Sequence, residues 1–279
     1  MSNNESIQRS PDRVAILEKI AEYEKERLFD RDVENDPPTV PLDYTKVDYA
    51  GKKPGTRFRA FFANIVAKGF YEKKIRRGEL IIKEVRGIEN YRSVKGGAIL
   101  SCNHFSVCDN YAVYKSIEKD LGRRRLYKVI REGNYTSFGG LYGYFFRNCN
   151  TLPLTSSLKG MGVMMRGVAE LLERGEKILI YPEQGMWWNY RKPRPLKDGG
   201  FMMAYKNSVP VIPFFITMED SDKLGEDGFP IQAYTVNILP PIYPDTSLDR
   251  RAGVAAMRDE NYRAWKEVYE NFYGIELTY

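Results

Sequence analysis

Short apolar runs typical of β-strands alternate along this chain with segments that have helical spacing. The strand-like runs fall at residues 80–85, 98–101, 126–130, 151–154, 177–181, 209–216 and 231–239. Helical patterns lie near residues 108–121, 135–146, 158–174 and 200–206, and a last one spans about residues 249–273. This alternation predicts an α/β domain with a largely parallel or mixed central sheet flanked by helices.

The strand-like run at 209–216 contains two prolines, Pro210 and Pro213. Proline has no backbone N–H and cannot donate a hydrogen bond to a neighbouring strand. We therefore expect this strand to lie at an edge of the sheet or to enter the sheet at a bend.

The N-terminal part of the chain differs in composition from the α/β part. Ser10 and Pro11 are typical of a helix start, and helical spacing of apolar residues continues to about Phe29. Several prolines among acidic residues and glycines at 31–56 predict an irregular linker. We therefore divide the chain into an N-terminal helix and linker at 1–56, a basic helix at 57–78 and a main domain at 79–279.

The segment 57–77 mixes large apolar residues with seven lysines and arginines. Its spacing predicts a helix with an apolar face made of Phe58, Phe61, Phe62, Ile65 and Val66. A basic helix with such a face can lie in the headgroup layer of an anionic bilayer. It can equally pack on its own domain with its cations in solvent.

Charge and cysteine content limit the classes of function. The net charge of +6 favours anionic partners, namely nucleic acid, acidic lipids or phosphate-bearing substrates. With three cysteines, one histidine and no C-x-x-C pair, we expect neither a disulfide framework nor a metal site. The polar N-terminus lacks the apolar segment of a signal peptide, and no apolar run has the length of a membrane-spanning helix. We expect a cytoplasmic protein or one attached to the inner face of a membrane.

A histidine and an aspartate lie at a predicted junction between a strand and a helix. His104 falls in the loop after the buried run at 98–101, and Asp109 in the first turn of the next helix. On one continuous helix their side chains would point about 140° apart, so they meet only if the backbone turns between them. Asp109 would then orient the imidazole of His104 as a base toward a hydroxyl. The pair alone is also compatible with a structural loop histidine.

A second polar group follows the strand-like run at 177–181. Glu183 comes just after its end, and a loop with Arg191, Arg194 and Lys197 comes next. Arginine and lysine side chains of this kind can bind a phosphate group. The same loop could also be a solvated basic surface.

The order of these segments resembles the glycerolipid acyltransferases, which include the 1-acylglycerol-3-phosphate acyltransferases. Asn103, His104 and Asp109 match their N-H-x-x-x-x-D motif, and Arg147 ends a segment similar to their second motif. Residues 181–183 partly match their F-P-E-G-T-R motif, and residues 209–213 match their V-P-V-I-P motif in full. The resemblance covers about residues 79–239.

The resemblance implies that His104 deprotonates the acceptor hydroxyl and that Asp109 stabilises the resulting imidazolium. It implies acyl-CoA or an acyl-carrier protein as the donor, a lysophospholipid as the acceptor, and no bound cofactor or metal. Asn103, Arg147, Glu183 and Gly185 are the residues that it assigns to substrate binding. It also favours contact of segment 57–77 with a membrane surface, and hence a peripheral protein on the cytoplasmic face.

The third motif departs from the family pattern. After Glu183 the chain reads Gln184, Gly185 and Met186, where the family has glycine, threonine and arginine. Arg191 or Arg194 could substitute for the missing arginine, and the acceptor is left open. The alternatives are a non-catalytic lipid-binding relative, a basic nucleic-acid-binding protein, which we do not expect, and a hydrolase, which no G-x-S-x-G motif supports.

Overall fold

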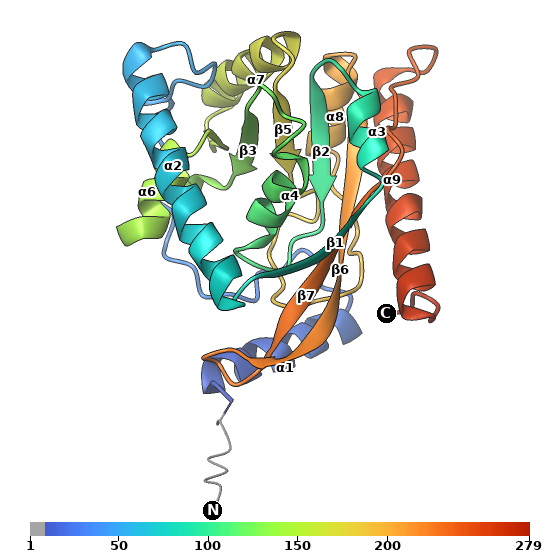
Figure 1. The fold of residues 1–279 in the computed structure, drawn as a ribbon. Helices are drawn as coiled ribbons and strands as arrows, with labels where there is room; N and C mark the ends of the chain where they lie inside the picture. Colours follow the sequence, from blue (N-terminus) through green and yellow to red (C-terminus); the bar gives the residue numbers. More distant parts are fainter. Residues whose placement is uncertain (1–8) are drawn as a thin grey trace, which may run out of the picture.

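The computed structural model describes residues 9–279, so most of the polar N-terminal segment lies outside the described residues. A mixed seven-stranded sheet in the order β1-β7-β6-β2-β5-β3-β4 forms the centre (Figure 1). All neighbouring pairs are parallel except β6 with β7. The predicted α/β class is confirmed. The strands are β1 (Ile81–Arg86), β2 (Ala98–Cys102), β3 (Leu126–Ile130), β4 (Thr151–Pro153), β5 (Lys177–Ile180), β6 (Val211–Leu224) and β7 (Pro230–Ile238).

Nine α-helices within residues 9–279 accompany the sheet. The predicted helix at 135–146 is two helices, because the chain turns at Gly139 and at Gly140, whose φ is +58°. The short helix α3 was not predicted from the sequence. The helices are α1 (Pro11–Lys25), α2 (Pro54–Arg77), α3 (Ile88–Ser93), α4 (Asp109–Ile117), α5 (Glu132–Thr136), α6 (Gly140–Asn148), α7 (Leu158–Glu173), α8 (Gly199–Lys206) and α9 (Arg250–Tyr273).

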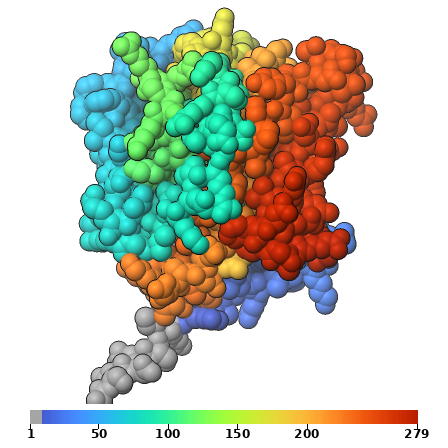
Figure 2. All heavy atoms as spheres, turned by 45° about the vertical axis from the view of Figure 1, so that its right-hand side comes forward, coloured from blue at the N-terminus to red at the C-terminus, as the bar shows by residue number. Residues whose placement is uncertain are grey.

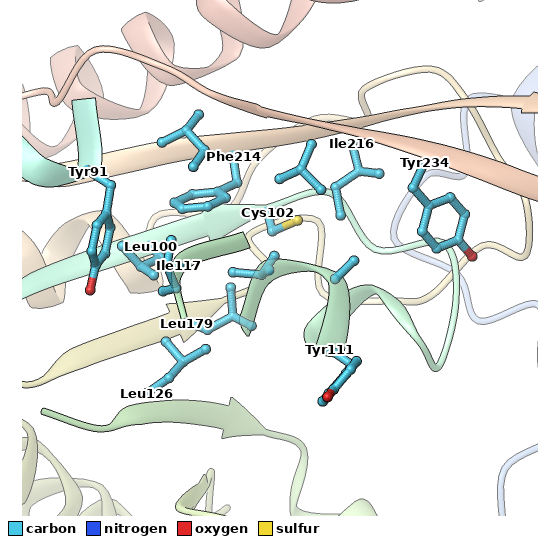
Figure 3. Close-up of a cluster of buried hydrophobic side chains, with 14 of the residues drawn as sticks. Tyr91, Leu100, Cys102, Tyr111, Ile117, Leu126, Leu179, Phe214, Ile216 and Tyr234 are labelled. Carbon is cyan, nitrogen blue, oxygen red and sulfur yellow. The ribbon is translucent and has the colours of Figure 1, made fainter. Parts of the chain in front are cut away.

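Two apolar cores lie on opposite faces of the sheet. Successive side chains of a strand point to opposite faces, so Leu100 joins one core and Ile99 the other. The first core packs against α4, with Tyr111 and Ile117 among its members (Figure 3). The second packs against α7, α8 and α9, and the C-terminal residues, α9 included, cover one side of the molecule (Figure 2). The sheet is thus covered on both faces, as parallel sheets usually are.

Of the two positions expected for the proline-containing strand, an edge of the sheet or a bend at its entry, the edge position is wrong. β6 pairs with β2 on one side and β7 on the other, in the interior of the sheet. Pro210 precedes the strand, and its carbonyl accepts a hydrogen bond from the N–H of Ile99. Pro213 lies one residue before the paired stretch of β6 and β7, which begins at Phe214 and Ile238, and its carbonyl accepts a hydrogen bond from the N–H of Leu239. Its missing N–H therefore falls at the start of the pairing rather than in its middle.

The N-terminal helix α1 lies near the end of the sheet to which β2 points (Figure 1). It ends at Lys25, earlier than predicted, and the side chain of Ser10 makes no cap hydrogen bond. The fully buried Trp187 packs among Ile20, Val33 and Phe29, and its ring N–H donates to the carbonyl of Arg31. The segment that follows Glu183 therefore anchors α1 and the linker to the main domain.

The first half of helix α2, up to about Val66, turns its small residues inward and its large apolar residues outward. Ala60 and Ala63 are buried, whereas the predicted apolar face is 47% to 66% exposed at each of its five residues, Phe58, Phe61, Phe62, Ile65 and Val66. Helix α6 lies beside α2 (Figure 1) and adds the exposed side chains of Leu141, Tyr142 and Tyr144. Across residues 9–279, no helix has both the length and the hydropathy to cross a membrane.

Candidate active site

The candidate site begins at the carboxyl end of β2. All five residues of this strand are buried, because it pairs with β5 and β6 and both faces are covered. Residues 103–108 then turn out of the sheet, and α4 begins at Asp109. Polar groups at the carboxyl ends of parallel strands meet at one edge of a sheet, where ligands of such folds usually bind.

The turn brings His104 and Asp109 together as predicted. His104 Nδ1 and Asp109 Oδ2 lie 2.7 Å apart. Asp109 is fully buried, whereas the side chain of His104 is 22% exposed. An ionised carboxylate is only an acceptor, so Nδ1 carries the proton and Nε2 is the ring nitrogen that can accept one.

Asp109 also holds the loop that carries His104. Its Oδ2 accepts the backbone N–H groups of Phe105 and Ser106, at 3.1 and 3.2 Å. The backbone N–H of His104 donates to Glu183 Oε2 at 3.0 Å, and its carbonyl accepts the N–H of Trp187 at 3.1 Å. Both sides of the loop are thereby fixed, which places the imidazole before any substrate arrives.

Asn103 has its polar atoms engaged by the sheet. Its side-chain oxygen accepts the N–H of Ile216, and its side-chain nitrogen donates to the carbonyl of the same residue, at 2.8 and 3.0 Å. These two bonds extend the pairing of β2 with β6 by one residue. With 2% of its surface exposed, Asn103 supports the strand end rather than facing a substrate.

Neither thiol beside the pair is an activated nucleophile. Burial raises the pKa of Cys108 to about 11, with the charge of Asp109 adding to the effect. Burial also raises the pKa of Cys102 well above its usual range. Both groups are neutral near pH 7, and a neutral thiol is a poor nucleophile. The imidazole is therefore the group at this site that can act as a base.

Glu183 and Arg194 form a buried ion pair, which corrects the expectation that Arg194 replaces the missing arginine. Glu183 Oε2 lies 3.2 Å from Arg194 Nη2, and Oε1 accepts the backbone N–H of Arg194 at 2.8 Å. Arg194 is 1% exposed and also donates to the carbonyls of Gly185 and Phe29. The polar groups of both side chains are thus bound to other groups of the protein. Through its bond to the backbone N–H of His104, Glu183 links this ion pair to the His104 loop.

The other predicted substrate-binding residues lie in different surroundings. Arg191 donates to Asp220 and Gln232 on the β6–β7 pair. Lys197 is half-exposed, 4.0 Å from Asp30. Gly185 lies beside Asp32, and a Cβ added there would come within 3.1 Å of Asp32 Oδ1.

Arg147 is the exposed cation of the second motif. It lies at the end of α6 and donates to the carbonyls of Tyr135 and Phe138, at 3.3 and 2.9 Å. Arg147 and Arg59 of α2 both lie near enough to Tyr135 for their charges to lower its pKa, against the larger raising effect of burial. One positive charge from α2 and one from α6 therefore act on Tyr135.

Tyr181 belongs to the site, although its role was not predicted from the sequence. Its ring stacks on the imidazole of His104, and its hydroxyl donates to Asp109 Oδ1 at 2.7 Å. Its position, one residue beyond β5 and two before Glu183, is the signal that could have identified it. A strand next to β2 necessarily ends near the His104 loop.

Comparison with known proteins relates this site to a family. Residues 83–217 match the acyltransferase family, a span that includes the His104 loop and Glu183. The chain is similar in structure to the 1-acyl-sn-glycerophosphate (LPA) acyltransferase PlsC from Thermotoga maritima, with a TM-score of 0.54 and 19% identity. That likeness covers 84% of this chain and 93% of the other, and at this identity it shows a shared fold. No curated protein matches the sequence.

Proposed function

This protein is an acyltransferase of the family that its motifs resemble, and from that premise we propose that its acceptor is a lysophospholipid. The fatty acyl group comes from a thioester, either acyl-CoA or an acyl-carrier protein. The reaction belongs to phospholipid biosynthesis. The observation that carries the proposal is the His104–Asp109 pair. Asp109 Oδ2 lies 2.7 Å from His104 Nδ1, and the imidazole of His104 is reachable from solvent.

The proposed reaction uses His104 first as a base and then as an acid. Nε2 removes the proton from the acceptor hydroxyl while the oxygen attacks the thioester carbonyl carbon. Asp109 stabilises the imidazolium that forms, as the aspartate does in a catalytic triad. The C–O bond forms, the C–S bond breaks, and the thiol leaves with the proton held at Nε2. The chemistry needs no metal or bound cofactor.

The acceptor is proposed to carry a phosphate, as 1-acylglycerol-3-phosphate does. Arg147 is the proposed phosphate ligand, because it is exposed and Arg59 adds a second positive charge nearby. Arg191 and Lys197 remain candidates on the basic loop. Glu183 pairs with Arg194 and accepts the backbone N–H of His104. Its proposed role is therefore to position the His104 loop, with other groups binding the polar part of the acceptor.

A screen of acceptors and donors tests this proposal. Purified protein is incubated with acyl-CoA or an acyl-carrier protein thioester and a panel of lysophospholipids, and the products are identified by mass spectrometry. We expect a diacyl phospholipid to form from at least one phosphate-bearing acceptor. Arg147→Gln should raise KM for that acceptor about tenfold with a smaller change in kcat, as for loss of a charge-assisted hydrogen bond. Hydrolysis of the thioester with no acylated lipid would contradict the proposal.

We further propose that α2 and α6 bind the surface of a membrane at its cytoplasmic face. The five exposed apolar residues of α2 form one stripe, and rings within it contact each other, with centroids 4.7 Å apart for Phe58 and Phe62. Arg57, Lys73 and Arg76 are exposed on the same helix. An exposed apolar patch flanked by cations is typical of helices that lie in the headgroup layer.

Vesicle co-sedimentation tests the membrane surface. Replacing Phe61, Phe62 and Ile65 with serine should reduce binding to anionic vesicles by about tenfold or more, since each buried apolar side chain contributes roughly 1.5 kcal/mol or more. The matched control places serine at Leu158, Leu248 and Ile275, which are exposed apolar residues outside α2 and α6. Equal loss of binding in both variants, or none in either, would argue against this surface.

A further inference from the structure

Tyr181 contacts both members of the catalytic pair through different parts of its side chain. Its ring lies almost parallel to the imidazole of His104, with centroids 4.0 Å apart and a 19° angle between planes. Its hydroxyl lies 2.7 Å from Asp109 Oδ1, while Oδ2 of the same carboxylate lies 2.7 Å from His104 Nδ1. One carboxylate therefore joins the phenol and the imidazole.

We propose that Tyr181 is a positioning residue that sets the strength of the His104 base through its hydrogen bond to Asp109. The inference rests on the proposed transfer reaction, because it concerns how readily His104 accepts the hydroxyl proton. The proposal assigns the hydroxyl and the ring separate roles. The ring holds the plane of the imidazole, and the hydroxyl adjusts the charge that the imidazole faces.

The hydroxyl of Tyr181 can only donate in this arrangement. Burial, followed by the negative charge of Asp109, raises the pKa of Tyr181 well above its usual range. The phenol is therefore protonated near pH 7, and an ionised carboxylate offers it only an acceptor. The hydrogen bond is charge-assisted and has the short length of that class.

The direction of the effect follows from how the carboxylate shares its charge. A donor on Oδ1 draws negative charge away from Oδ2, so Oδ2 stabilises the imidazolium less strongly. The imidazolium is then held less strongly, and the free base forms more readily than it would without this donor. Removing the donor should reverse this, and the base should become protonated over a wider range of pH.

Tyr181→Phe removes the hydroxyl and keeps the ring. Since His104 is the only histidine, NMR of protein labelled in histidine reports one imidazole. We expect that ring to titrate about one pH unit higher in the variant, a typical consequence of losing a hydrogen bond to a charged group. On the acid side of its pH–rate profile kcat/KM should fall about tenfold, and at high pH it should return to within about twofold of wild type.

Two further proteins separate this role from a structural one. Tyr49→Phe is the matched control, because Tyr49 is also buried and its hydroxyl makes one hydrogen bond, at 3.0 Å to the carbonyl of Pro153. Its imidazole titration should equal that of wild type. A fluorinated tyrosine at position 181, a stronger donor, should move the titration to lower pH, opposite to phenylalanine.

The outcomes separate this inference from the proposed function. An imidazole titration that is the same in wild type, Tyr181→Phe and the fluorinated protein would overturn the role of Tyr181. A shift of the titration in the expected directions, in a protein that acylates no lysolipid, would support the role of Tyr181 and contradict the proposed function.

Discussion

Replacing His104 with alanine is expected to lower the rate of acyl transfer by about 10²-fold or more. Loss of a general base typically costs 10² to 10⁴-fold, because the acceptor hydroxyl must then lose its proton to water. Within residues 9–279 no other imidazole can replace it, since the chain has one histidine. The loss should appear in kcat, with KM for the acceptor nearly unchanged, because His104 acts on the reacting oxygen rather than on the phosphate.

Double substitution and chemical rescue make this prediction sharper. Asp109→Asn should also lower kcat, but the double variant with His104→Ala should fall no further than His104→Ala alone, because the two residues act as a unit. The side chain of His104 is 22% exposed, so added imidazole can reach the space that it leaves and should restore part of the rate. Turnover that persists in His104→Ala would contradict the proposed mechanism.

Much of the fold could be predicted because its signals are local. The interior strands β2, β3 and β5 appear as short apolar runs, and their predicted bounds agree with the structure to within one residue. The place of β6 could not be predicted from Pro210 and Pro213 alone. Which side of a strand a proline nitrogen faces, and whether a neighbour pairs there, depends on strand order rather than on the sequence of the strand itself.

The residues of the candidate site also fall into two groups, those that local sequence could predict and those that depend on distant segments. His104 and Asp109 were predictable because a short turn joins them, so local sequence determines that they can meet. The roles of Tyr181 and Arg194 depend on contacts between distant segments. Arg194 lies in a loop with the composition of a phosphate-binding segment. Its guanidinium is nevertheless buried against Glu183 and the ring of Trp187, which also packs against α1. A cation in a basic loop is solvated or buried according to its tertiary neighbours.

The departure of the third motif has a structural explanation. The family has an arginine where this chain has Met186, and the next residue, Trp187, is buried against the N-terminal helix. Its backbone N–H donates to the carbonyl of His104. The segment after Glu183 thus packs against α1 and holds the His104 loop.

Glu183→Gln is expected to lower the free energy of unfolding by about 3–5 kcal/mol, because it leaves the charge of Arg194 buried without a partner. The Glu183 side chain is 2% exposed and that of Arg194 1%, so solvent cannot replace the lost carboxylate. Glu183 also accepts the backbone N–H of His104. The variant should therefore lose activity even under conditions where it remains folded. Urea unfolding followed by tryptophan fluorescence measures the first effect, and initial rates at low temperature measure the second.

Two controls decide whether burial of the charge is the cause. Glu219→Gln breaks an exposed ion pair, in which the side chain of Glu219 is 45% exposed and that of Lys83 55%. It should lower the free energy of unfolding by less than about 1 kcal/mol. The double variant of Glu183→Gln with Arg194→Met removes both buried charges and should be more stable than Glu183→Gln alone, because the uncompensated charge is gone. If Glu183→Gln lowers the free energy of unfolding no more than Glu219→Gln does, Glu183 does not hold the His104 loop through its pair with Arg194. Recovery of stability in the double variant without recovery of activity would show that the carboxylate itself positions His104.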